Sequence, residues 1–120
     1  MAGKIVADTL EHSTAGSIAT NYVVNGSAKQ FATYGTDAVI DTSLNTSSIS
    51  DIGTGQFDSN YINNMNTANE GFACTVWGTP SVSIAVIRTS TTALHRVNSY
   101  TTGSANDDEP QSTSVVGDLA

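Results

Sequence analysis

Apolar and polar residues alternate along much of this chain, in short runs separated by Gly, Asn, Ser and Thr. The clearest run spans residues 81–88, where Val82, Ile84 and Val86 fall on one face of an extended strand. Short alternating runs bounded by turn residues are typical of half-buried β-strands. We therefore predict strands over residues 4–8, 22–24, 29–34, 38–44, 47–52, 56–62, 72–77, 81–88, 93–101 and 112–119.

Turn residues indicate where these strands reverse. Asn25-Gly26, between two apolar segments, predicts a tight hairpin. Gly53 and Gly55 provide two positions that can take positive φ, which predicts a second hairpin turn. Residues 9–19 have no clean pattern and are expected to be extended and loop-like. Residues 63–71, 89–92 and 103–110 are expected to be loops or turns.

The spacing of the predicted strands favours one fold class. Strand centres recur roughly every ten residues, with turn signals between them and no alternation of strands with helices. This pattern predicts an all-β chain that forms an antiparallel β-sandwich or a jelly-roll-like domain. We expect residues 1–21 to form an N-terminal arm or attachment segment and residues 22–120 to form a single β-domain.

The composition supports this reading and adds a constraint. Ser, Thr and Asn make up 42 of the 120 residues, and these side chains compete with helices for backbone hydrogen bonds. Large apolar residues are scarce, so the core of the domain is expected to be thin. Small β-domains with thin cores often gain stability by oligomerisation.

The charge excludes some partners. The net charge of −7, from 4 basic and 11 acidic residues, argues against binding of nucleic acid or of anionic membranes. The first residues show no signal peptide, and no apolar run is long enough to span a membrane. The single cysteine, Cys74, lies in an apolar run and is expected to be a buried free thiol.

No catalytic or metal-binding motif stands out. His12 and His95 are expected to be polar residues of the surface or of a subunit interface, and the sequence contains no motif for a metal site. Three copies of either histidine could bind an ion on a symmetry axis, and this alternative stays open. We predict no cofactor.

The carboxylates are dispersed along the chain. The cluster at 107–109 is expected to be a solvated loop, because it lacks the spacing of a calcium site. Pairing Asp37 or Asp41 with Asp51 or Asp58 could make the acid and base of a glycosidase, but nothing in the sequence selects such a pair. We therefore predict that the chain is not an enzyme and has no catalytic residue.

Surface contacts remain the main candidate for function. Trp77 precedes a turn and would belong to a core or subunit interface, or else form a stacking platform for a sugar. Asparagine amides in a loop suit either a turn or the recognition of sugar hydroxyls. The candidate contact residues are Asn63, Asn64, Asn66, Asn69, Trp77, Asp107 and Asp108, and the candidate structural turns are formed by Asn25, Gly26, Gly53 and Gly55.

Two motifs carry a family resemblance. Residues 24–29 read VNGSAK, and residues 47–57 read SSISDIGTGQF. This pair resembles a β-structured module of bacteriophage virion proteins, found in tail fibres, receptor-binding fibre ends and related structural proteins. The resemblance covers roughly residues 22–120 and includes the ending VVGDLA at 115–120. The chain departs from the family where Gln30-Phe31 replaces the usual tryptophan and where Ile40, not a basic residue, precedes Asp41.

The resemblance implies a virion protein. It implies a homotrimer that binds other virion proteins of the tail or capsid, made in the host cytoplasm. The first hypothesis is a small tail-fibre or fibre-tip component that mediates host attachment through a surface glycan or protein. The alternative is a capsid decoration, or cement, protein on the phage head.

Overall fold

The computed structural model describes residues 6–76, 83–101, 104–105 and 111–120. Within these residues α1 is the one helix, and the rest of the regular structure is antiparallel strand, so the all-β prediction is confirmed. The elements in chain order are β1 (Thr9–His12), β2 (Gly16–Ala19), α1 (Thr20–Gly26), β3 (Ala28–Tyr34), β4 (Ile40–Leu44), β5 (Thr46–Gly53), β6 (Gln56–Tyr61), β7 (Gly71–Val76), β8 (Ser83–Ser90), β9 (Leu94–Thr101), β10 (Ser104–Ala105) and β11 (Gln111–Val116).

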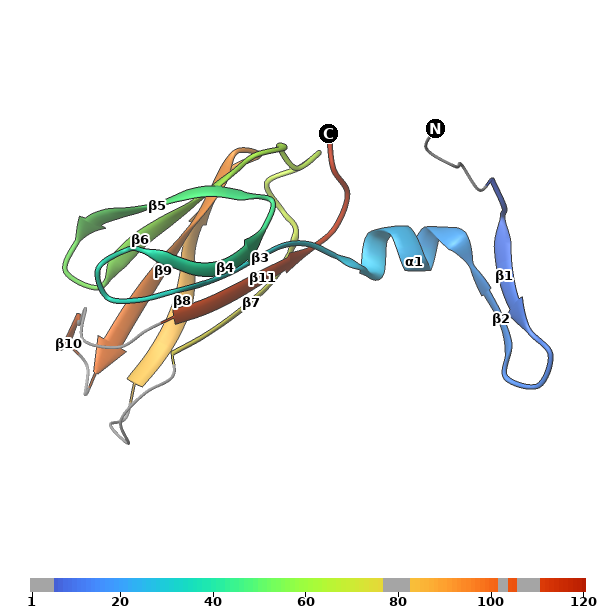
Figure 1. The fold of residues 1–120 in the computed structure, drawn as a ribbon, viewed down its shortest axis with the longest axis horizontal. Coiled ribbons are helices and arrows are strands. Elements are labelled where there is room, and N and C mark those ends of the chain that lie inside the picture. Colours follow the sequence, from blue (N-terminus) through green and yellow to red (C-terminus); the bar gives the residue numbers. More distant parts are fainter. Residues whose placement is uncertain (1–5, 77–82, 102–103, 106–110) are drawn as a thin grey trace.

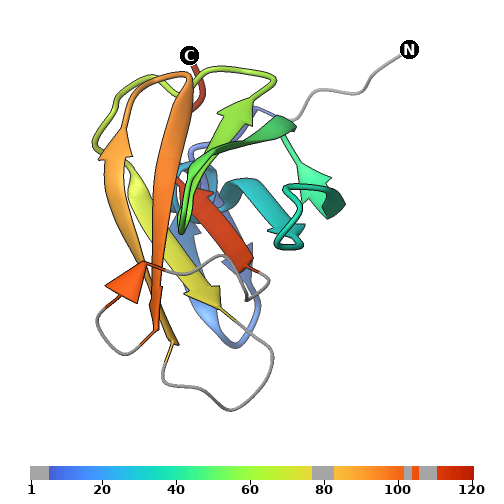
Figure 2. The same ribbon diagram turned by 90° about the vertical axis from the view of Figure 1, so that its left-hand side faces the viewer.

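The described strands beyond α1 form a sandwich of two layers (Figures 1 and 2). One layer, here called the β3 sheet, has the order β4-β3-β11-β7. The other, the β5 sheet, contains β8, β9, β6 and β5, with β10 paired to the end of β9. In β3, β7 and β11 alternate residues point between the layers, which explains the two-residue period of their sequences.

The hairpin predicted at Gly53 and Gly55 is confirmed. β5 and β6 pair through this turn, where φ is +153° at Gly53 and +68° at Gly55. The Asp51 side chain closes the turn by accepting a hydrogen bond of 3.0 Å from the Gly53 amide. Glycine suits both positions because other residues rarely adopt these angles.

The hairpin predicted at Asn25-Gly26 is wrong, because both residues lie in the last turn of α1. The strand predicted at 22–24 is wrong for the same reason. β3 does not pair with that segment: its neighbours are β4 and β11. An Asn-Gly pair favours a hairpin only where the flanking segments pair, and here β3 obtains its partners from farther along the chain.

The chain begins with a projecting segment, here called the arm, which comprises described residues 6–26 (Figure 1). Residues 9–19, expected to be loop-like, form the hairpin β1–β2, with Leu10 directly opposite Ile18. The strand predicted at 4–8 is wrong for residues 6–8, and residues 4 and 5 lie outside the described part. The division expected at residue 21 falls within α1.

The other strand predictions agree with the structure to within a few residues. β4 begins at Ile40, and β8 continues to Ser90, so the turn expected at 89–92 lies at 91–93. Val86 of β8 is on the solvent-exposed face. Ser104 and Ala105, expected in a loop, form β10.

A single residue carries the chain from one sheet to the other. Asn45 joins β4 to β5 with a positive φ of 55°. Its side chain accepts a hydrogen bond of 2.7 Å from the Asn63 amide and donates one of 3.0 Å to the Asn63 carbonyl. Asparagine tolerates this backbone conformation better than most residues, so the corner can be both sharp and fixed.

The apolar core is small and divided. Tyr34 and Phe57 pack with their ring centres 5.6 Å apart, together with Ala32 and Ile49. A second cluster contains Tyr61, Met65 and Val115, with Phe72 packed against it.

Buried polar side chains join the two sheets. The Gln30 amide of β3 donates to Thr46 of β5 at 2.9 Å and to Ser59 of β6 at 3.2 Å. The Gln111 amide of β11 donates to Ser99 of β9 at 3.1 Å. These hydrogen bonds connect opposite layers, so they fix how one sheet lies on the other.

We predict that Gln111→Ala lowers the free energy of unfolding by about 2–4 kcal/mol. The substitution removes the acceptor of the Tyr34 hydroxyl, 3.0 Å away, and the link to Ser99. Urea denaturation of the two proteins measures the difference. Gln56→Ala is the matched control, because Gln56 is half-buried and its side chain makes no hydrogen bond among the described residues. Equal losses in both variants would contradict a special role for Gln111.

Candidate functional site

The asparagine-rich loop between β6 and β7 lies at the end of the sandwich from which the arm leaves (Figure 1). Two contacts fix this placement. Met65 bridges to Leu119 near the end of the chain, and Val116 of β11 pairs with Ala28, the first residue of β3. The loop therefore lies beside the root of the arm.

The backbone of this loop is held in place. The Met65 amide donates to the Thr92 carbonyl at 2.7 Å, and the Asn66 amide donates to Asp118 at 2.9 Å. The Ala120 amide donates to the Asn64 carbonyl at 3.0 Å. Two other segments of the chain, the β8–β9 turn and the C-terminal residues, therefore hold the backbone of the loop in place.

The predicted contact residues differ in what they can offer. Asn63, Asn64, Asn66 and Asn69 are all exposed. The Asn63 side chain bonds to Asn45 at 3.2 Å, whereas the side-chain amides of the other three make no hydrogen bond among the described residues. Three amides are thus available to an external partner. Trp77, Asp107 and Asp108 lie outside the described residues.

A groove of about 420 Å³ opens beside this loop, between the start of β7 and the end of β8. Asn69 and Glu70 lie on one wall, and Arg88 lies on the other. Glu70 accepts hydrogen bonds from the amide and hydroxyl of Thr67, at 3.3 Å and 3.0 Å. Arg88 is exposed and makes no ion pair within the described part of the chain. The groove can therefore offer donors and acceptors to a polar ligand.

The sequence did not single out Glu70 or Arg88. The groove exists because β7 and β8, the last strands of different sheets, meet at one edge of the sandwich. The one signal in the sequence was Arg88, a charged residue at the end of the alternating run 81–88. No neighbouring residue in the sequence indicated that Arg88 belongs to a binding site.

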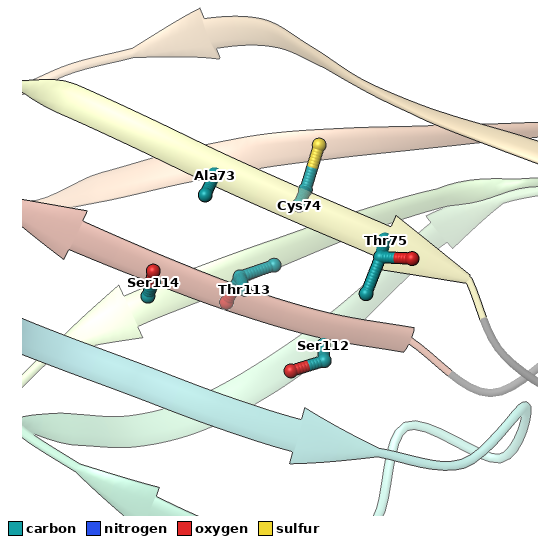
Figure 3. A pocket seen from close by; sticks show the side chains of 6 residues that line it. All are labelled: Ala73, Cys74, Thr75, Ser112, Thr113 and Ser114. Atoms are coloured by element: carbon teal, nitrogen blue, oxygen red, sulfur yellow. The ribbon is translucent and has the colours of Figure 1, made fainter.

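A second hollow, of about 200 Å³, lies over β7 and β11 (Figure 3). Its lining consists of Ala73, Cys74, Thr75, Ser112, Thr113 and Ser114. Cys74 is a free cysteine, half-buried where burial was expected, and burial raises the pKa of its thiol. A raised pKa makes a thiol a poorer nucleophile at neutral pH.

His95 is not a surface residue, and that expectation is wrong. It is 0% exposed, and its Nδ1 lies 2.9 Å from the Tyr61 hydroxyl. Phe72 packs against the imidazole with ring centres 5.6 Å apart. Burial lowers the pKa of His95 to about 4, against a smaller opposing effect of Asp58. The side chain of His12 lies outside the described residues.

Three of the four carboxylates considered as an acid and base, those of Asp37, Asp51 and Asp58, have partners of their own. Asp58 binds Arg96 through two hydrogen bonds, of 2.6 Å and 2.8 Å. Asp37 accepts from the Val39 amide at 3.1 Å, and Asp51 closes the β5–β6 turn. These carboxylates hold local structure. Among the described residues, no three His, Cys, Asp or Glu side chains gather as metal ligands.

The described helix is too short to cross a membrane. Searches of protein-family models, of curated proteins and of solved structures find no match to this chain.

We predict that burial of His95 makes stability depend on pH between about 6.5 and 4. The unfolded chain binds a proton at His95 below its ordinary pKa, whereas the folded chain does so only near pH 4, so stability falls as the pH falls. The loss at pH 4 is about 3 kcal/mol for this residue. Urea denaturation at pH 7, 5.5 and 4 measures it.

His95→Gln is the control variant, because its amide can still reach the Tyr61 hydroxyl without titrating. We expect the variant to lose this part of the pH dependence and to keep the part that comes from carboxylates. An unchanged pH profile in the variant would show that His95 is not the group responsible.

Proposed function

We propose that this chain is a non-enzymatic structural protein of a bacteriophage virion, a small tail-fibre or fibre-tip component that mediates attachment to the host. The observation that carries the proposal is the arm. α1 has no buried residue, and the apolar side chains of β1 and β2 are exposed. An isolated two-stranded hairpin and a helix of this length are marginal in water, so the arm is suited to docking on another protein.

The resemblance of residues 24–29 and 47–57 to the virion module supports the same proposal. In the motif at residues 47–57, Gly53 and Gly55 form the turn of the β5–β6 hairpin. The sandwich then serves as a rigid body that carries contact surfaces, and the arm joins it to its neighbours in the particle.

Host contact is assigned to the loop amides of Asn64, Asn66 and Asn69 and to the adjoining groove with Arg88. Amide and guanidinium groups form hydrogen bonds with the hydroxyl groups of a glycan. Each contact is weak, but the copies of a homotrimer bind together and raise the effective concentration. Because the loop lies beside the arm, contact along the side of a fibre fits this arrangement better than contact at its tip.

We expect purified protein to adsorb to host cells and to compete with phage infection. Replacing Asn64, Asn66 and Asn69 together by alanine should raise the concentration needed for competition at least about tenfold, because every copy loses the same contacts. The matched control is Thr36→Ala with Thr54→Ala. Both residues are exposed, one between β3 and β4 and the other between β5 and β6, and these turns lie at the end of the sandwich opposite the arm (Figure 1).

Two outcomes would contradict this assignment. Wild-type protein that fails to adsorb, and whose labelled form covers whole capsid faces in images of the particle, would identify a decoration protein instead. Adsorption that is unchanged in the triple variant would remove the loop from the contact surface while leaving the virion role intact.

A further inference from the structure

The exposed apolar side chains of the described residues are unevenly distributed. Val39, Ile52 and Val86 lie on the sandwich away from the arm. The other large ones lie either on the arm or on the sandwich close to its root: Val6, Leu10, Ile18, Tyr22, Val23, Val24, Phe31, Leu44, Ile62, Val116 and Leu119. Concentrated apolar surface of this kind marks a site of protein association.

One part of this surface is on the outer side of the β3 sheet. Gln30, Ala32 and Tyr34 point into the core, so Phe31 points outward. Leu44 pairs with Phe31 on the neighbouring strand, and Val116 is exposed on β11. We call Phe31, Leu44 and Val116 the root face.

The surroundings of the root face are free of acidic groups along β11 and β7. On the outer side of these strands lie Ala73, Thr75, Ser112 and Ser114, which are all small and uncharged (Figure 3). The chain as a whole has a net charge of −7, so copies repel each other across most of their surfaces. On the β11 and β7 side of the root face, two copies can therefore approach without repulsion between acidic groups, and on β3 the charged neighbour two residues from Phe31 is the basic Lys29.

The arm cannot cover the root face of its own chain in this structure. α1 leads away from the sandwich, and the hairpin lies beyond it (Figure 1). Two hydrogen bonds between Thr20 and the backbone of Asp8 hold the hairpin to the start of α1. Leu10 and Ile18 therefore stay exposed at one end of the molecule while Phe31 and Leu44 stay exposed on the sandwich.

We infer that the arm of one copy docks through Leu10 and Ile18 on the root face of a second copy of this chain. Stable interfaces use about 20–30 residues on each side, which matches the length of the arm. The two surfaces differ, so the contact is heterologous; a rotation of 120° between copies closes such contacts into a ring of three. The docking itself is inferred from the exposed apolar surfaces. Only the expected number of copies, three, rests on the proposed function.

Light scattering of full-length variants tests the docking. Wild-type protein should show about three times the 12.4 kDa mass of one chain. Ile18→Asp on the arm and Leu44→Asp on the root face should each give the mass of a single chain, because a carboxylate cannot be buried in an apolar contact. Ile52→Asp is the matched control: Ile52 is 48% exposed, like Leu44 at 48% and Ile18 at 46%, and it should leave the assembly intact.

Mixing the two dissociated variants gives the decisive result. The Leu44→Asp chain keeps a good arm, and the Ile18→Asp chain keeps a good root face, so the mixture should form a complex of two chains. A cooperative urea transition in each variant, with the same midpoint in the two, would show that both variants fold.

Three results would overturn the inference: a wild-type mass of one chain at micromolar concentration, an intact assembly in either variant, or a mixture that stays monomeric. A wild-type mass of one chain would also remove the avidity expected in host contact, whereas the other two results leave the adsorption test of the proposed function unaffected; a monomer that still adsorbs would keep the virion role and reject the docking.

Discussion

The fold depends on the amides of Gln30 and Gln111, which join the two sheets through hydrogen bonds in an interior with little apolar surface. Apolar contacts allow one sheet to slide over the other, whereas a side-chain amide finds hydrogen-bond partners in only a few alignments of the sheets. Removing one partner leaves the other buried and unpaired, which is costly. The hydrogen bonds therefore select one alignment of the layers, and that alignment places the loop between β6 and β7 beside the end of β8.

Sequence patterns predicted structure well where two independent signals agreed. At β5 and β6, alternation and a pair of glycines both required a hairpin, and the structure contains it. At Asn25-Gly26 the preceding segment, residues 22–24, is apolar throughout and shows no alternation, so the predicted hairpin depended on the turn signal and on which strand would pair with β3. That partner, β11, lies near the other end of the sequence. Local sequence preferences cannot show whether β3 pairs with the segment just before it or with a strand near the other end of the chain.

The candidate site was predictable in part. Composition alone indicated that Asn64, Asn66 and Asn69 would be exposed in a loop, and they are. The groove could not be foreseen, because Glu70 and Arg88 come together only when two sheets close on each other. His95 was predicted wrongly for a similar reason: its Nδ1 lies within hydrogen-bond distance of the Tyr61 hydroxyl inside the protein, and that position follows from the pairing of β6 with β9.

The corner at Asn45 also bears on aggregation. A long flat edge strand offers unpaired backbone groups to any other strand, and proteins at high local concentration can stack through such edges into fibrils. Here β4 is short, its pairing with β3 contains an irregularity next to Thr33, and the chain turns at once into the opposite sheet. An incoming strand would meet a bend instead of a straight template. Many copies can thus be held at high local concentration without forming fibrils through the β4 edge.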